Sequence, residues 1–236
     1  AVMVPADQSP LCATVRADGP VRAPKDLEGR TLAAPEFDGG RQVFPIFARA
    51  AGFDAAKVQW TNVSPELREP MLVQRRADGV TGFITTTGMS LKGLGMDWPA
   101  QRIFRYREQP GLDFLGWAVL TTKRFAEERP EAVRAALLGI SRAMIWSTRN
   151  PDRAIADLKA RESLTDVAIE AERQQVFFRE MLVSDNARAN GLSQFDPARL
   201  ERQIEAVKTV FNLPRAPGAG DAYTDAFLPA RSERAL

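Results

Sequence analysis

The chain has 236 residues and a mass of 26.0 kDa, which suffices for one large domain or two smaller lobes around a buried core. Its hydrophobic content of 44% and charged content of 26% are typical of globular proteins and exclude disordered, collagen-like and coiled-coil chains. The formal net charge is only +2, from 32 basic and 30 acidic residues, which argues against a nucleic-acid-binding protein that relies on bulk positive charge.

The sequence contains no histidine, and this excludes several kinds of chemistry. Ser-His-Asp and Cys-His catalysis, His-ligated zinc and proton transfer by imidazole are impossible within this chain. The single cysteine, Cys12, excludes intrachain disulfides and thiolate clusters, and we expect it to be a small buried hydrophobe. No motif for a metal ion or a cofactor is present, so we expect neither.

The sequence has no stretch that spans a membrane. No apolar run approaches the roughly 20 residues that a bilayer requires. The first 15 residues lack both the basic start and the continuous apolar core of a signal peptide. The chain is therefore either cytosolic or a mature or truncated form from which the signal has been removed.

Strand-like segments alternate with helix-like segments in the first half of the chain. An apolar stripe predicts a helix from Val43 to Gly52, and Ser64 and Pro65 predict the start of a helix that runs to about Arg76. A short helix to Leu94 follows the third strand. This alternation indicates a parallel or mixed sheet covered on both faces. The predicted strands are 30–34, 58–63, 79–84, 103–106 and 115–121.

The second half reads as almost entirely helical. Pro130, Pro151 and Pro197 predict three helix starts. Two apolar stripes at four-three-four spacing, from Val133 to Met144 and from Leu200 to Phe211, are predicted core faces. The tail that follows reads as loop with one short helical turn.

This pattern predicts three parts with different roles. Residues 1–25 are expected to hold the hinge strand or strands and the remnant of a first lobe. Residues 26–121 form an α/β ligand-binding lobe, and residues 122–236 form a helical segment that packs on the first lobe. Because about a hundred helical residues follow a small α/β lobe, we expect an N-terminal piece, with the sheet that these helices cover, to be missing.

Several segments, in their order and spacing, resemble a known family. Residues 26–32 (DLEGRTL) match the D-L-x-G-[KR]-x-[IL] segment that opens the second lobe of many periplasmic substrate-binding proteins. Six further segments resemble ABC-transporter binding proteins related to thiamine-pyrimidine synthases and to sulfonate and taurine binders. They are 41–52, 77–83, 111–119, 125–136, 190–199 and 227–229.

The resemblance covers nearly the whole chain from residue 20 onward, with two departures. Relatives begin with first-lobe residues that this chain lacks, and they usually carry Tyr-Gly-Asn where this chain has Leu115, Gly116 and Trp117. The resemblance implies a fold like that of type II periplasmic binding proteins, with two lobes that hold mixed or parallel sheets. It also implies a periplasmic protein that clamps a small ligand between its lobes and delivers it to the membrane permease of an ABC importer.

Helix starts place the predicted ligand site within the α/β lobe. Open α/β sheets bind ligands beyond the carboxyl ends of their strands, where helix N-termini offer free N–H groups and partial positive charge. Three such junctions follow the first three strands of this lobe, so we expect an acidic ligand group there. A plainer interpretation makes Asp38 a helix N-cap and Arg41 a solvated surface charge. The predicted contacts are Asp38, Gly39, Gly40, Arg41, Ser64, Thr85 and Thr86.

Three aromatic residues near predicted strand ends are expected to border the same cleft. Phe83, Phe114 and Trp117 would provide stacking faces for a flat heterocycle or an aromatic acid. Aromatic residues in strands more often belong to the core, and we favour that interpretation for Phe83. Trp117 is the better candidate because it replaces a residue that lines the cleft in relatives.

The leading hypothesis is therefore a solute-binding protein for a small anionic or aromatic organic compound. A cofactor-free isomerase or lyase on the same fold is an alternative, and a ligand-sensing module is another. The pyrimidine-synthase branch of relatives uses a histidine side chain and a cysteine-rich segment. This chain has neither, so that chemistry is excluded.

Overall fold

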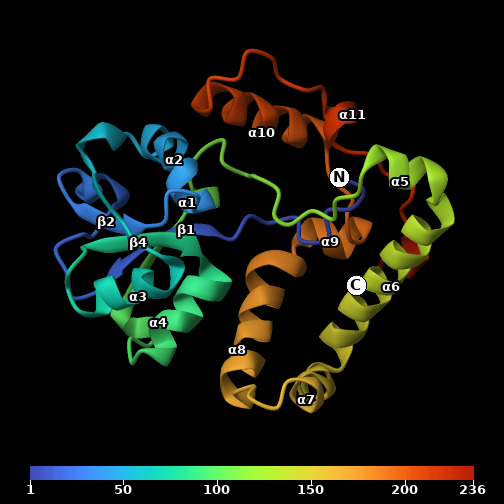
Figure 1. Cartoon of the computed structure of the whole chain (residues 1–236), viewed down its shortest axis with the longest axis horizontal. Coiled ribbons are helices and arrows are strands. Elements are labelled where there is room, and N and C mark those ends of the chain that lie inside the picture. The colour runs from blue at the N-terminus through green and yellow to red at the C-terminus, as the bar shows by residue number, and fades with distance from the viewer. The chain divides into compact units, whose positions relative to one another are not determined.

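The structure, a computed structural model, describes residues 1–236, and backbone contacts divide them into two compact units (Figure 1). We call Pro10–Asp113 with Ala206–Leu213 the sheet unit, and Ala1–Ser9, Phe114–Glu205 and Pro214–Leu236 the helical unit. None of the helices is long and apolar enough to cross a membrane. The roles predicted for residues 1–25, 26–121 and 122–236 stay predictions.

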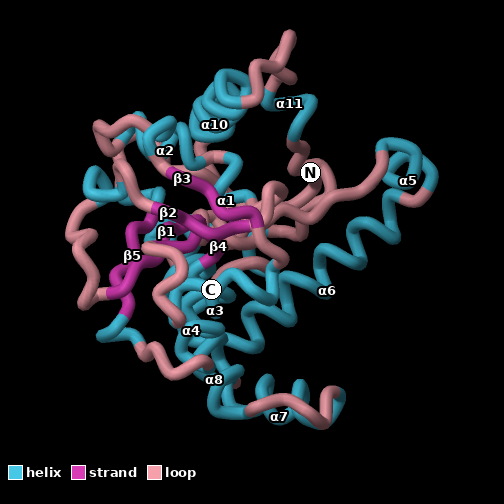
Figure 2. The backbone as a smooth tube through the Cα atoms, turned by 60° about the vertical axis from the view of Figure 1, so that its left-hand side comes forward, coloured by secondary structure: helices cyan, strands magenta, loops and turns pink.

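A five-stranded sheet in the order β3-β2-β4-β1-β5 forms the centre of the sheet unit (Figure 2). β2 pairs in parallel with β3 and β4, whereas β1 runs antiparallel to both β4 and β5. Four strands therefore share one direction and β1 alone opposes them, so the predicted mixed sheet is confirmed. The strands are β1 Leu11–Arg16, β2 Thr31–Ala34, β3 Gln59–Asn62, β4 Gly79–Phe83 and β5 Gln101–Arg105.

Helices cover both faces of this sheet, as the alternation of segments predicts. Successive residues of a strand point to opposite faces, and β4 shows the division. Val80 packs with Leu72 and Leu91 of α3 and α4, whereas the Thr81 hydroxyl bonds to the N-cap of α1. The helices of this unit are α1 Gly39–Gln42, α2 Phe44–Ala50, α3 Pro65–Val73 and α4 Met89–Gly93.

An aromatic cluster fixes α1 and α2 to the sheet. Phe47 stacks on Tyr106 with ring centroids 4.2 Å apart, and Phe44 meets Trp60 edge to face at 5.2 Å. The buried Tyr106 hydroxyl donates to the Gly40 carbonyl at 3.0 Å. Because a buried hydroxyl needs a partner, this bond ties α1 to the chain that follows β5.

The helical unit begins three of its helices at the prolines that the sequence singles out. The first apolar stripe lies in its core, where Val133 and Leu137 are buried against Met3 and Leu182. The second stripe, on α10, is only half-buried: Leu200 packs on the core around Phe195, but α10 has no fully buried residue, and Phe211, just after it, is 42% exposed. The helices are α5 Lys123–Glu128, α6 Pro130–Arg149, α7 Pro151–Arg161, α8 Val167–Phe177, α9 Asp185–Asn190, α11 Ala219–Ala222 and α10 Pro197–Val210, whose residues from 206 onward belong to the sheet unit.

The strand predicted at 115–121 is wrong. This segment pairs with the N-terminal residues only through an isolated bridge between Met3 and Val119 and a bond from the Gly116 amide to the Ala6 carbonyl. Pro5, between these points, has no N–H to give, and the Val4 amide donates instead to Ser193 Oγ. The ladder is interrupted for this reason, and no regular strand forms.

Candidate functional site

The carboxyl ends of β2, β3 and β4 lie at one edge of the sheet. Ala34 is aligned with Asn62 across β2 and β3, and β4 runs parallel to β2. The three junctions that the sequence predicts as a ligand site are therefore brought to the same edge. The two predicted contact residues that belong to the helical unit, Phe114 and Trp117, are described separately below. The predicted residues on the sheet unit are Asp38, Gly39, Gly40, Arg41, Ser64, Phe83, Thr85 and Thr86.

Asp38 is the N-cap of α1, and its carboxylate is fully engaged. Oδ1 accepts the Arg41 amide at 2.9 Å and the Thr81 hydroxyl at 2.7 Å. Oδ2 accepts Arg68 Nη1 at 3.0 Å. Asp38 thus holds the β2–α1 turn against both β4 and α3, and its predicted contact with a ligand stays a prediction.

Arg68, on α3, is the residue of this edge that the sequence interpretation missed. Its guanidinium is only 12% exposed and contacts the Glu69 carboxylate at 2.7 Å as well as Asp38. One signal in the sequence could have found it. Arg68 lies four residues before the buried Leu72, and that spacing places both on the same helix face.

Gly40 is explained by close packing of α1 on β4. A Cβ atom there would lie 3.0 Å from the Gly82 amide nitrogen and 3.0 Å from Thr81 Cβ. The first amides of a helix lack intrahelical partners, and Asp38 satisfies that of Arg41. The other amides of this first turn belong to Gly39, which is half-buried, and to Gly40, which is buried.

Arg41 joins the ends of two strands and is not simply a solvated surface charge. Its Nη1 donates to the Ala34 carbonyl at 2.9 Å and approaches Asn62 Oδ1 at 3.4 Å. The guanidinium carbon lies 4.9 Å from the centre of the Trp60 ring, within the range of a cation–π contact. These partners are uncharged, so the positive charge of Arg41 persists at the edge.

At the start of α3, the side chains of Ser64 and Glu66 bond to each other. Ser64 is exposed and stands at the N-cap position, without a capping hydrogen bond to the helix. Its hydroxyl bonds to the Glu66 carboxylate, and this bond, with one to the backbone of Glu66, lowers the pKa of Glu66. An anion at Ser64 would therefore meet a second negative charge.

The chain after β4 forms a π-helical turn, Ile84–Gly88, which carries the predicted threonines. Thr85 is buried, whereas Thr86 is exposed and donates its hydroxyl to the Phe83 carbonyl at 3.2 Å. Thr87, which was not predicted, has a buried hydroxyl oxygen without a hydrogen-bond partner. Phe83 itself is half-buried.

In the helical unit, Trp117 and Phe114 have different environments. Trp117 is 42% exposed and stacks on Phe177 of α8, with ring centroids 5.1 Å apart and planes at 19°. Phe114 is buried, and its carbonyl accepts the Ser9 amide and Arg199 Nη2. Trp117 therefore presents a surface, whereas Phe114 belongs to the interior of its unit.

Cys12 is buried, as expected, and its thiol has low reactivity. Burial raises the pKa of its thiol to about 12, so the reactive thiolate is absent at neutral pH. Sγ lies 3.6 Å from the Gly82 carbonyl. No group of three or more cysteine, aspartate or glutamate side chains is arranged to hold a metal ion.

Solved structures of two periplasmic sulfonate-binding proteins and of one enzyme have a fold similar to that of this chain. The periplasmic sulfonate-binding protein SsuA from Methylobacillus flagellatus KT is 14% identical, with a TM-score of 0.64 over 95% of this chain and 66% of its own. The alkanesulfonate-binding protein SsuA from Xanthomonas axonopodis pv. citri, bound to MOPS, is 15% identical. Its TM-score is 0.65, over 94% of this chain and 73% of its own. A mutant of the desulfurization enzyme DSZB, in complex with biphenyl-2-sulfinic acid, is 13% identical, with a TM-score of 0.57 over 96% and 76%.

The chain belongs to the NMT1/THI5-like family, whose sequence pattern matches residues 1–154. This agrees with the resemblance to relatives of thiamine-pyrimidine synthases. No curated protein has a sequence that matches the chain significantly. The chain spans 66% of the length of the first of the three solved structures above.

Proposed function

We propose that this protein is a solute-binding protein that captures a small anionic or aromatic organic compound for an ABC importer. The observation that carries the proposal is the parallel register that brings the carboxyl ends of β2 and β4 to one edge, with Arg41, whose contacts are uncharged, after β2. Gly39 and Gly40 also follow β2, and Thr86 follows β4. Beyond the carboxyl ends of parallel strands is where α/β sheets bind ligands. Periplasmic localisation and a permease partner are part of this proposal.

The charges at this edge favour an anion. Asp38 and Glu69 are both paired with Arg68, whereas Arg41 contacts only uncharged groups. A planar guanidinium suits the oxygens of a sulfonate or a carboxylate. Phe37, in the loop after β2, is 72% exposed and offers an apolar surface for the rest of the ligand.

The same contacts support binding rather than catalysis as the role of this edge. A carboxyl group that acts as a general acid or base must be able to exchange a proton with a ligand. The Asp38 oxygens are held by the Arg41 amide, Thr81 and Arg68, and Glu69 is held by Arg68. An enzyme on this fold, such as DSZB, remains the alternative that the experiment must distinguish.

Native mass spectrometry of the protein, purified without refolding, would test for a retained small molecule. Thermal denaturation with benzenesulfonate, butanesulfonate and the uncharged benzenesulfonamide would then test the charge preference. We expect both sulfonates to raise the melting temperature and benzenesulfonamide to raise it less. A ligand that binds only the folded state raises stability by RT ln(1 + [L]/Kd).

Arg41→Gln is the test variant, and Arg49→Gln, on the exposed side of α2, is its matched control. The sulfonate effect should shrink in the first and persist in the second. Equal effects in both variants would contradict the role of Arg41. Conversion of the retained molecule during incubation would favour the enzyme.

A further inference from the structure

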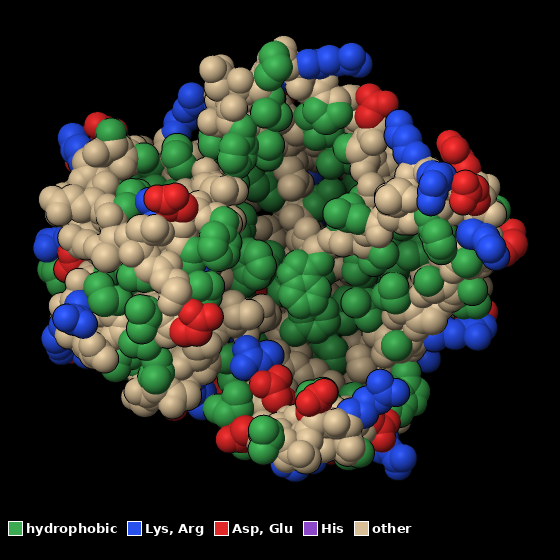
Figure 3. All heavy atoms as spheres, in the orientation of Figure 1, with side chains coloured by type: hydrophobic (Ala, Val, Ile, Leu, Met, Phe, Trp, Pro, Cys, Tyr) green, Lys and Arg blue, Asp and Glu red, His purple; other side chains and the backbone are tan.

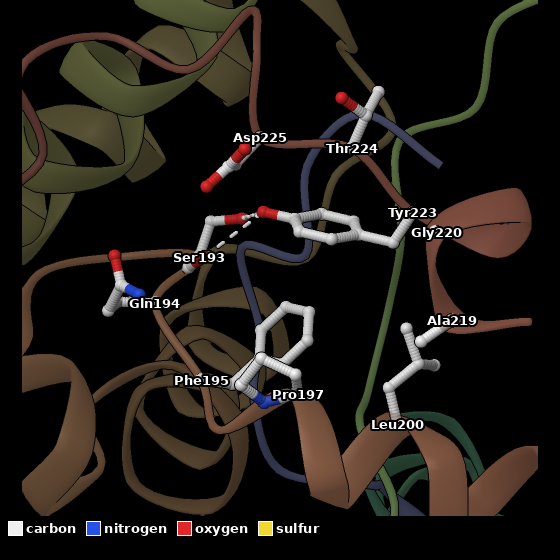
Figure 4. Close-up of a pocket in the computed structure, with 10 residues that line it drawn as sticks. All are labelled: Ser193, Gln194, Phe195, Pro197, Leu200, Ala219, Gly220, Tyr223, Thr224 and Asp225. Carbon is white, nitrogen blue, oxygen red and sulfur yellow. Dashed lines mark hydrogen bonds between the residues drawn. The ribbon is translucent and has the colours of Figure 1, made fainter.

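A cavity lies wholly within the helical unit, and none of the residues assigned above lines it. It has a volume of about 400 Å³ and is formed by the loop before α10, the first turn of α10, α11 and the residues after α11 (Figure 4). Ser193, Phe195, Leu200, Tyr223 and Asp225 are among the residues that line it. The size is within the range of pockets that hold small organic molecules.

Two hydroxyl groups converge in this cavity, and their mutual bonds are long. The Tyr223 hydroxyl lies 3.3 Å from Ser193 Oγ and also 3.3 Å from the Ser193 carbonyl oxygen. Hydroxyl bonds usually measure 2.7–2.8 Å, so both groups can still bond to a ligand. Burial raises the pKa of Tyr223, which keeps its phenol protonated at neutral pH.

The loop that carries Ser193 is held in place before any ligand arrives. Ser193 has a φ of +66°, a conformation that is uncommon for residues other than glycine and is often found at binding sites. Arg234, which is buried, donates to the carbonyl of Leu192 at 2.7 Å and to the side chain of Gln194 at 3.2 Å. The Val4 amide donates to Ser193 Oγ at 2.7 Å. The site is therefore preorganised.

The cavity is lined partly by aromatic and aliphatic side chains and partly by polar ones, and the one charged residue that lines it is acidic. The Phe195 and Tyr223 rings lie 4.8 Å apart at 53°, and Leu200 packs beside them. Asp225 is the single charged residue among those that line the cavity. Figure 4 shows its carboxylate beside the pair of hydroxyl groups. A cation is attracted to this carboxylate and to the aromatic faces. The Arg234 guanidinium also acts on Tyr223, but it is bonded to the Leu192 carbonyl and the Gln194 side chain and does not line the cavity.

We propose that this cavity binds a small organic ammonium ion with an aromatic or short aliphatic body. The ammonium group donates hydrogen bonds to the Asp225 carboxylate and to the oxygens of Ser193 and Tyr223. The body packs against Phe195 and Leu200. The site is independent of the proposed function, because it lies on the other unit and takes a ligand of opposite charge.

The test is a titration of the full chain with benzylamine, followed through the backbone amide resonances of Ser193, Gly220 and Thr224. Benzoate and benzyl alcohol are controls with the same ring but a negative charge or none. We expect benzylamine to shift these three resonances with saturation in the millimolar range, benzyl alcohol to bind at least fivefold more weakly, and benzoate not to bind.

Asp225→Asn removes the charge with little change of shape, and we expect it to weaken benzylamine binding at least fivefold. Glu201→Gln makes the same change at an exposed position of α10 that does not line the cavity, and it should leave binding unchanged. Leu200→Trp fills the cavity and should abolish binding. Equal binding of benzoate and benzylamine, equal affinity in D225N and E201Q, or no shift at the three amides would each overturn the proposal.

Discussion

Asp38 Oδ2 lies 3.0 Å from Arg68 Nη1, and the two side chains are only 9% and 12% exposed. This ion pair connects the β2–α1 turn with α3, two segments that follow different strands of the sheet. Removing one partner of a buried pair leaves an uncompensated charge, which costs more than the pair itself contributes. The edge that carries the proposed ligand contacts therefore depends on Arg68.

We expect Arg68→Ala to lower the free energy of unfolding by roughly 2–4 kcal/mol, because Asp38 and Glu69 would both lose their cation. Urea denaturation measures this directly. Arg75→Ala is the control, since Arg75 pairs with Asp18 at the surface with exposures of 62% and 54%, and such pairs contribute at most about 1 kcal/mol. Similar losses in the two variants would show that burial does not determine the cost.

A second pair of variants tests the packing of α1 on β4. Gly40→Ala places a Cβ atom 3.0 Å from backbone and side-chain atoms of β4, so we expect a loss of about 1–3 kcal/mol. Gly93→Ala, on α4, meets no atom within 4 Å. It should be neutral or stabilising by about 0.5–1 kcal/mol. Thermal melts of the two proteins would contradict this if G40A were the more stable.

The order of strands and helices in the sheet unit could be predicted because local signals agree with the fold. The start of α3 at Pro65 and the apolar stripe of α2 are encoded in short windows of sequence. The failed strand at 115–121 depended on a partner far along the chain, where Pro5 interrupts the pairing. The exposure of the α10 stripe is likewise a property of what surrounds the helix, not of its own spacing.

The candidate site shows the same limit. Helix starts identified the β2–α1 turn and Ser64, and the parallel register brings these junctions to one edge. The role of Arg68 could not be predicted with the same ease, because a charged pair such as Arg68 and Glu69 on a helix usually faces solvent. Its burial follows from contacts with Asp38, which is thirty positions away in the chain.

Cys12 gives a prediction for alkaline pH. Its thiol has an ordinary pKa of 9.0 in the unfolded chain and of about 12 in the folded protein. The unfolded state thus loses a proton first, so the contribution to stability is complete below pH 9 and declines as pH rises toward 12. The decline is roughly 1 kcal/mol per pH unit.

The difference in unfolding free energy between the wild type and Cys12→Ala isolates this effect, because other titrating groups are common to both proteins. We expect the difference to be constant from pH 7 to 8.5 and to fall between pH 9 and 10.5. A difference that stays constant to pH 10.5 would show that the thiol is accessible to solvent.

Exposed apolar side chains of the helical unit predict binding of a hydrophobic dye. Leu164 is 98% exposed and Leu120 is 74% exposed, and Trp146 and Phe125 are more than 40% exposed. Figure 3 shows hydrophobic side chains on the visible surface of this unit. Surfaces of this kind bind an uncharged hydrophobic dye such as Nile red or promote association. Leu120→Ser with Leu164→Ser should reduce dye fluorescence without lowering the melting temperature, and a wild-type chain that binds no dye would contradict the prediction.

Trp117 and Trp146 provide the sharpest test of the predicted aromatic contact with a ligand, because both belong to the helical unit and both are 42% exposed. Trp117→Ala should weaken the binding of benzenesulfonate by about 1–3 kcal/mol, the range for the loss of an aromatic anchor. It should change the ligand-free melting temperature little, since the ring packs mainly by stacking on Phe177. Trp146→Ala should leave binding unchanged. A large loss of ligand-free stability in W117A, with no loss of affinity beyond that of W146A, would make Trp117 a structural residue and contradict its predicted contact with the ligand.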